Sequence, residues 1–192
     1  MPTTTSNLTT FSEVARLDEA FTTLDAPSNA QTSNDVRAAW TTVVPESQTW
    51  SSYIKGVQLV TPPDAGVTVT EIRVILERRK SGAAETLHDS AVHLVKGGVI
   101  QTAVNTATAT AYTTSDVSET HTFTAANLAT LGITITDVRA ADFGVAFSFN
   151  NTIGATGTIV AQVDHMFVEV DWTPAGSGFP PSEIGMMGCG IN

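Results

Sequence analysis

Two aspartates are the residues of this sequence that could most readily do chemistry. Asp89 and Asp164 each lie in a stretch that alternates apolar and polar residues, and Asp164 shares its phase with Val160 and Met166. Strand side chains point alternately to two faces, so this phase directs the Asp164 carboxylate inward, where an unpaired charge is costly. The two carboxylates could bind a metal or act as an acid and a base. We favour a structural role, in which both accept backbone N–H groups of neighbouring loops, because no run of further ligands accompanies either one.

The other reactive side chains form no recognisable catalytic or zinc motif. The four histidines are scattered along the chain: His88, His93, His121 and His165. No two of them have the spacing of a zinc-binding helix. His165 follows Asp164 directly, but neighbouring residues of a strand point to opposite faces, which argues against a catalytic pair. The single cysteine, Cys189, lies in a glycine-rich stretch without a base fixed beside it. The sequence therefore predicts no catalytic residue, no metal ligand and no cofactor.

The charge of the chain argues against nucleic-acid and membrane surfaces. Its 192 residues include 9 Lys and Arg against 19 Asp and Glu, a formal net charge of −10. Nucleic-acid binding draws most of its affinity from basic side chains, so no DNA or RNA partner is expected. No apolar run approaches the roughly 18 residues of a membrane span, and no basic amphipathic stretch is present. The N-terminus lacks the basic and apolar regions of a signal peptide, so we expect assembly in a cytoplasm.

The elements that position these residues are predicted to be strands. Residues 67–78 and 89–96 predict a central hairpin pair, and Gly97–Gly98 predicts a turn that needs positive φ. The apolar phase of the first stretch shifts at Thr70–Glu71, which indicates a β-bulge. Further strands are predicted at residues 36–44, 50–60 (with a phase shift near 55–56), 99–112, 119–124, 143–149 and 158–172. Two helical turns are predicted at 127–132 and 136–141, the second capped by Thr136, and a weak helical pattern covers 11–21.

Short strands separated by Gly, Pro, Asn and Asp turns predict an all-β fold, an antiparallel β-sandwich of jelly-roll-like type. We assign residues 21–173 to this domain, residues 1–20 to an extended N-terminal arm and residues 174–192 to a Gly/Pro-rich C-terminal arm. Chain termini are normally disordered unless they are held, so we expect both arms to dock on neighbouring subunits. The predicted docking residues of the C-terminal arm are apolar: Phe179, Ile184, Met186, Met187 and Ile191.

The aromatic residues have two possible roles. The candidates are Trp40, Trp50, Tyr53, Tyr112 and Trp172. They could form a platform on which sugar rings stack, but aromatic residues on strands more often belong to the core. We favour the core.

Four blocks of sequence, in this order, resemble a known module. They are TEIRVILERR (residues 70–79), DSAVHLVKGG (89–98), DFGVAFSFNN (142–151) and VDHMFVEVDW (163–172). Together with LDAPSNAQTSND (24–35) and SSYIKGVQL (51–59), they are similar to a β-sandwich module that recurs in structural proteins of tailed bacteriophages and in prophage-encoded proteins. The similarity covers about residues 21–172 and includes neither end of the chain.

The resemblance implies a non-enzymatic virion structural protein, located in the virion and assembled in the host cytoplasm. Within that class we favour a head decoration or cement protein that docks on neighbouring subunits through its arms. The implied partners are the major capsid protein or neck and tail proteins, together with further copies of the chain in a homo-oligomer. A neck, collar or tail-fibre component is the alternative. Rivals from other classes are a carbohydrate-binding host-adhesion module and an acidic scaffold protein of a bacterium.

Overall fold

Eleven strands, two short α-helices and one 3-10 helix form the described part of the chain, in a computed structural model that describes residues 1–15, 23–44, 49–50, 53–81, 86–152 and 157–175. The strands are β1 (Thr3–Val14), β2 (Thr23–Asp25), β3 (Ala38–Val44), β4 (Thr49–Trp50), β5 (Tyr53–Leu59), β6 (Thr68–Ser81), β7 (Thr86–Lys96), β8 (Val99–Ile100), β9 (Val117–Phe123), β10 (Gly144–Thr152) and β11 (Gly157–Thr173). The helices are η1 (Pro27–Ala30), α1 (Ala125–Leu131) and α2 (Ile135–Val138). None of the helices in these ranges is long and apolar enough to cross a membrane.

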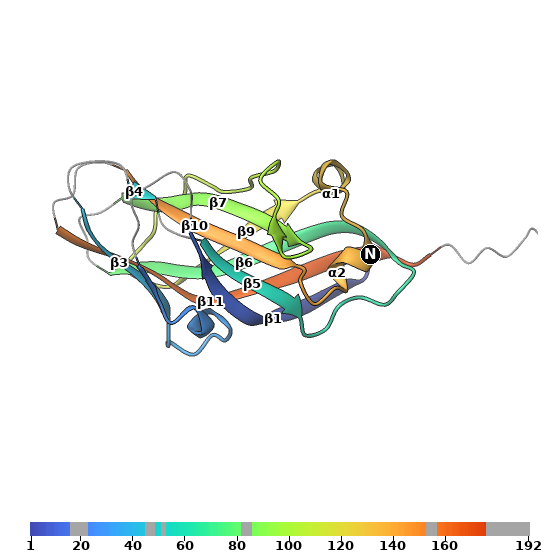
Figure 1. Ribbon diagram of the computed structural model, residues 1–192, viewed down its shortest axis with the longest axis horizontal. Helices are drawn as coiled ribbons and strands as arrows, with labels where there is room; N and C mark the ends of the chain where they lie inside the picture. The colour runs from blue at the N-terminus through green and yellow to red at the C-terminus, as the bar shows by residue number, and fades with distance from the viewer. Residues whose placement is uncertain (16–22, 45–48, 51–52, 82–85, 153–156, 176–192) are drawn as a thin grey trace, which may run out of the picture.

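The strands form two antiparallel sheets that pack against each other (Figure 1). In the first, sheet A, β11 is central: β6 and then β9 lie on one side, and β3 with β2 and the first half of β1 lie on the other. In the second, sheet B, the order is β1, β5, β10, β7 and β8, and β4 also pairs with β10. The predicted all-β antiparallel fold is confirmed, while its jelly-roll character stays a prediction.

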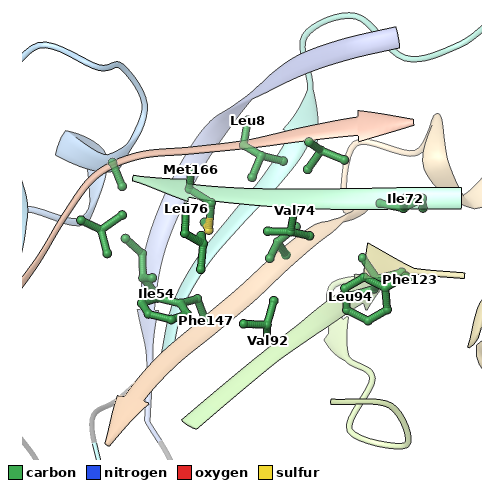
Figure 2. Packing of buried hydrophobic residues seen from close by; sticks show 14 of the residues in the cluster. Leu8, Ile54, Ile72, Val74, Leu76, Val92, Leu94, Phe123, Phe147 and Met166 are labelled. Carbon is green, nitrogen blue, oxygen red and sulfur yellow. The ribbon is translucent and has the colours of Figure 1, made fainter. Parts of the chain in front are cut away.

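The core lies between the two sheets and is made from the inward side chains of both. Figure 2 shows Val74, Leu76 and Met166 of sheet A close to Ile54 and Phe147 of sheet B, and all five are fully buried. Removing such surface from water is worth about 25 cal/mol per Å², so this layer is the main source of stability. At one end of the core α1 adds Leu128 and Leu131.

Strand β1 belongs to both sheets. Its residues Thr3–Asn7 pair with β11, and its residues Leu8–Val14 pair with β5. The predictions of a separate arm and of a helical pattern are therefore wrong for Thr3–Val14. Alternation is hard to see there because an early inward position is polar: Ser6 is buried, and its hydroxyl accepts the backbone N–H of Thr61 at 2.9 Å.

Two bulges interrupt the pairing of β6 with β11. Asp171 pairs with Glu71 and Trp172 with Val69, so Thr70 is the additional residue, and the bulge predicted at Thr70–Glu71 is confirmed. The second shift makes Asp164 the additional residue of β11, because its neighbours Val163 and His165 pair with consecutive residues of β6. A bulge reverses the face to which later residues point. The inward residues before this bulge are consequently Ala161 and Val163, and the prediction that Val160 shares the inward phase of Asp164 is wrong.

Gly144 allows β10 to approach β5 closely, and Gly56 makes room for core side chains of β1. A Cβ atom at Gly144 would overlap the carbonyl oxygen of Gly56, and a Cβ atom at Gly56 would lie 2.8 Å from both Leu8 and Phe11. Next to this contact Gln58 has a φ of 66°, and its N–H donates to the Phe143 carbonyl at 2.8 Å. The phase shift predicted near residues 55–56 thus falls at Gln58.

Residues 101–116, which we name the strap, connect β8 to β9. The predicted strand over 99–112 is wrong beyond Ile100, because the strap follows β7 without forming a regular ladder. Its N–H groups donate to β7 carbonyls at three places: Gln101 to Leu94, Thr106 to Val92, and Tyr112 to Leu87. The side chain of Asn105 adds two more hydrogen bonds to β7: its Oδ1 accepts the Val92 N–H and its Nδ2 donates to the Ser90 carbonyl, both at 3.0 Å. The strap thereby occupies the outer edge of β7.

The turn and helix-cap predictions are largely confirmed. Gly97 and Gly98 both have positive φ. The first predicted helical turn is α1, which ends at Gly132 with a φ of 61°. The second turn is α2, but its capping box begins at Thr134 and the prediction of Thr136 as its cap is wrong.

Candidate functional site

A buried polar cluster joins the two sheets where the strap bridges them. We define it by Asp89 and the five residues around it, Arg78, Thr108, Tyr112, Glu119 and His121. Asp89 lies on β7 of sheet B. Arg78 lies on β6 of sheet A. Its side chain points inward because it continues the phase of the buried apolar residues before it. Its neighbour strand β9 supplies Glu119 and His121.

Both oxygens of the Asp89 carboxylate are engaged. Oδ1 accepts the Tyr112 hydroxyl at 2.9 Å and lies 3.0 Å from Arg78 Nε. Oδ2 accepts Arg78 Nη2 at 3.1 Å and the Thr108 hydroxyl at 3.3 Å. The expected backbone N–H donors are therefore replaced by side-chain donors. Hydrogen bonds that involve an ionised group are stronger than those between neutral groups, so the guanidinium is the main tie of this side chain.

The Arg78 guanidinium is enclosed as completely as the carboxylate. Its side chain is 1% exposed, its Cζ lies 4.2 Å from the centre of the Tyr112 ring, and Nη2 lies 3.6 Å from the Glu119 carboxylate. A cation held over an aromatic face and beside two carboxylates is compensated on several sides. The Arg78 guanidinium thereby connects β6 with β7, β9 and the strap.

His121 faces an oxygen on each side of its ring. Its Nδ1 lies 2.9 Å from the Thr106 carbonyl oxygen of the strap, and its Nε2 lies 3.3 Å from Asp89 Oδ2. Both ring nitrogens therefore face acceptor oxygens, one in the strap and one on β7. The ring thus fixes the strap to sheet A.

Tyr112 is a permanent donor in this cluster. Burial, with the Asp89 carboxylate beside it, raises the pKa of the Tyr112 hydroxyl well above its usual value near 10. The hydroxyl therefore keeps its proton at any ordinary pH. It serves as a fixed hydrogen-bond donor that ties the strap to β7.

Asp164 lies apart from the partners of Asp89. It is 2% exposed, at the bulge in β11, and its Oδ1 is buried without a hydrogen-bond partner among the described residues. The Asp164 carboxylate interacts electrostatically with Arg37, whose guanidinium binds Asp116 through Nε at 3.2 Å and Nη2 at 2.8 Å. The hydrogen bond to Asp116 raises the pKa of Arg37, so the guanidinium keeps its charge. The structure thus does not unite the two aspartates in one site.

The remaining histidines also lie in separate places. His165 stacks on Phe167 with a centroid separation of 4.7 Å, and its Nε2 lies 3.1 Å from the Asn7 amide oxygen. Burial lowers the pKa of His165. His93 lies on β7 with its Nδ1 2.7 Å from the Val104 carbonyl oxygen of the strap. Within the described ranges, no three His, Cys, Asp or Glu side chains are grouped to hold a metal ion.

The aromatic residues do not share one exposed face. Trp40 and Tyr112 are buried, and Trp40 makes edge-to-face contacts with Phe147 at 6.0 Å and Phe149 at 5.4 Å. The core role that we favoured is confirmed for these two. Tyr53 and Trp172 are partly exposed, and nothing is described of the Trp50 side chain.

The predicted docking residues Phe179, Ile184, Met186, Met187 and Ile191 lie outside the described residues, as does Cys189. Residues of the Asp89 cluster that sequence reasoning missed are Arg78, Thr108, Glu119 and His121. One signal could have found Arg78: it continues the alternation of Ile72, Val74 and Leu76 and so points inward. Thr108 has no such signal, because the strap has no periodicity.

Comparison of the sequence with protein-family models gives no match, and comparison with curated proteins gives none either.

Proposed function

We propose that this chain is a non-enzymatic structural protein of a tailed-bacteriophage particle, placed on the head as a decoration or cement protein. The support for the phage part is the resemblance of the four sequence blocks. Those blocks lie mainly in β6, β7, β10 and β11, which pair as β6 with β11 and β7 with β10. The residues that carry the resemblance therefore form one strand pair in each sheet.

The observation that carries the non-enzymatic part is the closure of the Asp89 cluster. A general acid or base must come within hydrogen-bond distance of the proton that it transfers. The Asp89 side chain is fully buried, and its two oxygens are held by Arg78, Thr108 and Tyr112. This arrangement fits a clamp between the two sheets and the strap, and a rigid two-sheet body is a suitable platform for protein contacts.

A neck, collar or tail-fibre position is the alternative within the same class, because it needs the same kind of platform. The carbohydrate-binding reading is weaker, since two of its five candidate aromatics, Trp40 and Tyr112, are buried.

Particle composition tests the proposal directly. Phage or prophage particles are induced from the strain that encodes the chain, purified by density gradient and analysed by quantitative mass spectrometry. We expect the chain in the particles at a fixed ratio to the major capsid protein. Cryo-electron microscopy then separates a head position from a neck or tail position. Abundant expression in the lysate together with absence from the particles would contradict the proposal.

Truncation tests the docking role of the C-terminal arm. Deleting residues 174–192 removes the predicted docking residues but none of the paired strand residues, which end at Thr173. We expect an unchanged far-ultraviolet circular dichroism spectrum and loss of the protein from purified particles. A matched variant replaces Phe179, Ile184, Met186, Met187 and Ile191 with serine and keeps the chain length. Normal incorporation of both variants would show that the arm does not dock.

A further inference from the structure

The outer edge of β9 has no strand partner among the described residues and none of the usual protecting features. β9 pairs with β6 along its whole length, from Val117 opposite Arg78 to Phe123 opposite Ile72, and with no other described strand. Half of the backbone groups of an edge strand point away from its neighbour and are free to pair with another strand. Proteins usually protect such an edge with lysine, proline, a bulge or a very short strand. β9 has seven residues, no lysine or proline, and an unbroken register.

The strap does not provide that protection. Its contacts with β9 go to inward side chains, from the Thr106 carbonyl to His121 and from the Thr108 hydroxyl to Glu119. None of its backbone hydrogen bonds within the described ranges goes to β9. Three other edges are guarded: β2 has three residues, β8 has two, and the strap covers β7. Ser118 and Thr120 of β9 are exposed.

The sequence of β9 is complementary to itself when it is reversed. An antiparallel pair of two β9 strands centred on Thr120 places Thr120 opposite Thr120 and Ser118 opposite Thr122. The same register places Glu119 opposite His121 and Val117 opposite Phe123. Apart from Glu119 with His121, the pairs join residues of one kind, hydroxyl with hydroxyl or apolar with apolar. Glu119 and His121 remain engaged in the Asp89 cluster of their own subunit, and no like charges meet. Cross-strand pairs of these types are favourable, whereas like charges directly opposite each other are unfavourable.

We propose that two copies of this chain associate through β9, antiparallel about a twofold axis at Thr120, so that the two copies of sheet A become one continuous sheet. Such an interface uses the same patch on both subunits, as twofold dimers do. Strand addition supplies main-chain hydrogen bonds, and the side-chain pairs set the register. This interface is independent of the virion assignment, because it rests on β9 alone.

Cysteine cross-linking tests the contact and its register. In a Cys189→Ser background, Thr120→Cys places two thiols directly opposite each other at a Cα separation of about 4.5–5.5 Å, which a disulfide can span. Thr122→Cys in the same background is the register control, because its own copy would lie four residues away, about 13 Å. After mild oxidation we expect a covalent dimer for the first variant and monomer for the second. Equal cross-linking of both variants, or of neither, would overturn the proposed interface.

A charge substitution tests the same contact without new covalent chemistry. Thr120→Lys puts two like charges opposite each other at the axis, and we expect the dimer dissociation constant to rise at least about tenfold in sedimentation equilibrium. Thr10→Lys, on an exposed residue of β1, is the matched control and should leave it unchanged. A monomeric wild-type chain, or equal weakening by both substitutions, would overturn the proposal.

Discussion

At the scale of single residues, the buried charge of Arg78 costs hydration that its partners must offset. Its side chain is 1% exposed and that of its partner Asp89 is fully buried. Two such charges lose their hydration on folding, and their attraction offsets this loss only when further hydrogen bonds complete the site. Tyr112 and Thr108 supply those bonds to the carboxylate. The cluster is therefore sensitive to the removal of any one member.

Asp89→Asn is expected to lower the free energy of unfolding by about 3–5 kcal/mol, because it leaves the Arg78 charge buried without its main counter-charge. Asp35→Asn is the matched control: Asp35 pairs with Arg37, but its side chain is 85% exposed, and removing an exposed ion pair costs about 0–1 kcal/mol. Urea unfolding followed by tryptophan fluorescence measures both. Equal effects of the two substitutions would show that the buried cluster does not clamp the sheets.

The sequence indicates some members of this cluster and hides others, for identifiable reasons. Asp89 stands out as a carboxylate within an apolar strand, and Arg78 could be placed inward by alternation alone. Tyr112 and Thr108 reach the cluster from the strap, whose path is set by hydrogen bonds to β7 and not by a periodic pattern. Asp164 was placed inward correctly, but the bulge that puts it there depends on its register with β6. Register between distant strands is a tertiary property that one strand's sequence does not contain.

At the scale of elements, the strap performs the task of a missing strand. Residues of β7 beyond its short pairing with β8 need partners on their outer side, because an unpaired backbone group that is buried is costly. The strap provides N–H donors at irregular intervals, and Asn105 provides an amide that acts as both acceptor and donor. Its alternation of small residues and threonine resembles a strand, which explains the incorrect prediction over 99–112.

Asn105→Ala is expected to expose the β7 edge locally. The substitution removes the acceptor of the Val92 N–H and the donor to the Ser90 carbonyl, and a buried group left unsatisfied costs about 1–3 kcal/mol. Hydrogen–deuterium exchange measured by NMR should show at least about tenfold faster exchange of the Val92 amide, with little change at Ile72 in β6. Asn105→Asp, which keeps the acceptor, should preserve most of that protection. Unchanged exchange in Asn105→Ala would mean that the strap protects β7 without this side chain.

At the scale of the whole molecule, strand β1 connects the two sheets, in contrast to the arm that the sequence suggests. One half pairs with β11 and the other with β5, so the strand crosses from sheet A to sheet B within 12 residues. Leu8, at the crossing, is fully buried and lies against Gly56, where a Cβ atom would meet it at 2.8 Å. The N-terminal strand is thus part of the core. β1 stands at the start of the chain and β11 near its end, so the sequence around β1 gives no local sign of this role.

Deleting residues 1–14 is accordingly expected to abolish cooperative unfolding, because the deletion exposes one edge of β11 and one edge of β5 and removes Leu8 from the core. The milder substitution Leu8→Ala should retain a cooperative transition with a free energy of unfolding lower by about 2–5 kcal/mol. Thr10→Ala, at an exposed position of the same strand, is the control and should change it by less than about 0.5 kcal/mol. Differential scanning calorimetry distinguishes these outcomes, and a sharp transition in the deletion variant would restore the view of this segment as a detachable arm. Under our account the two ends of the chain differ in kind: the first 14 residues hold the sheets together, whereas loss of residues 174–192 leaves the fold intact.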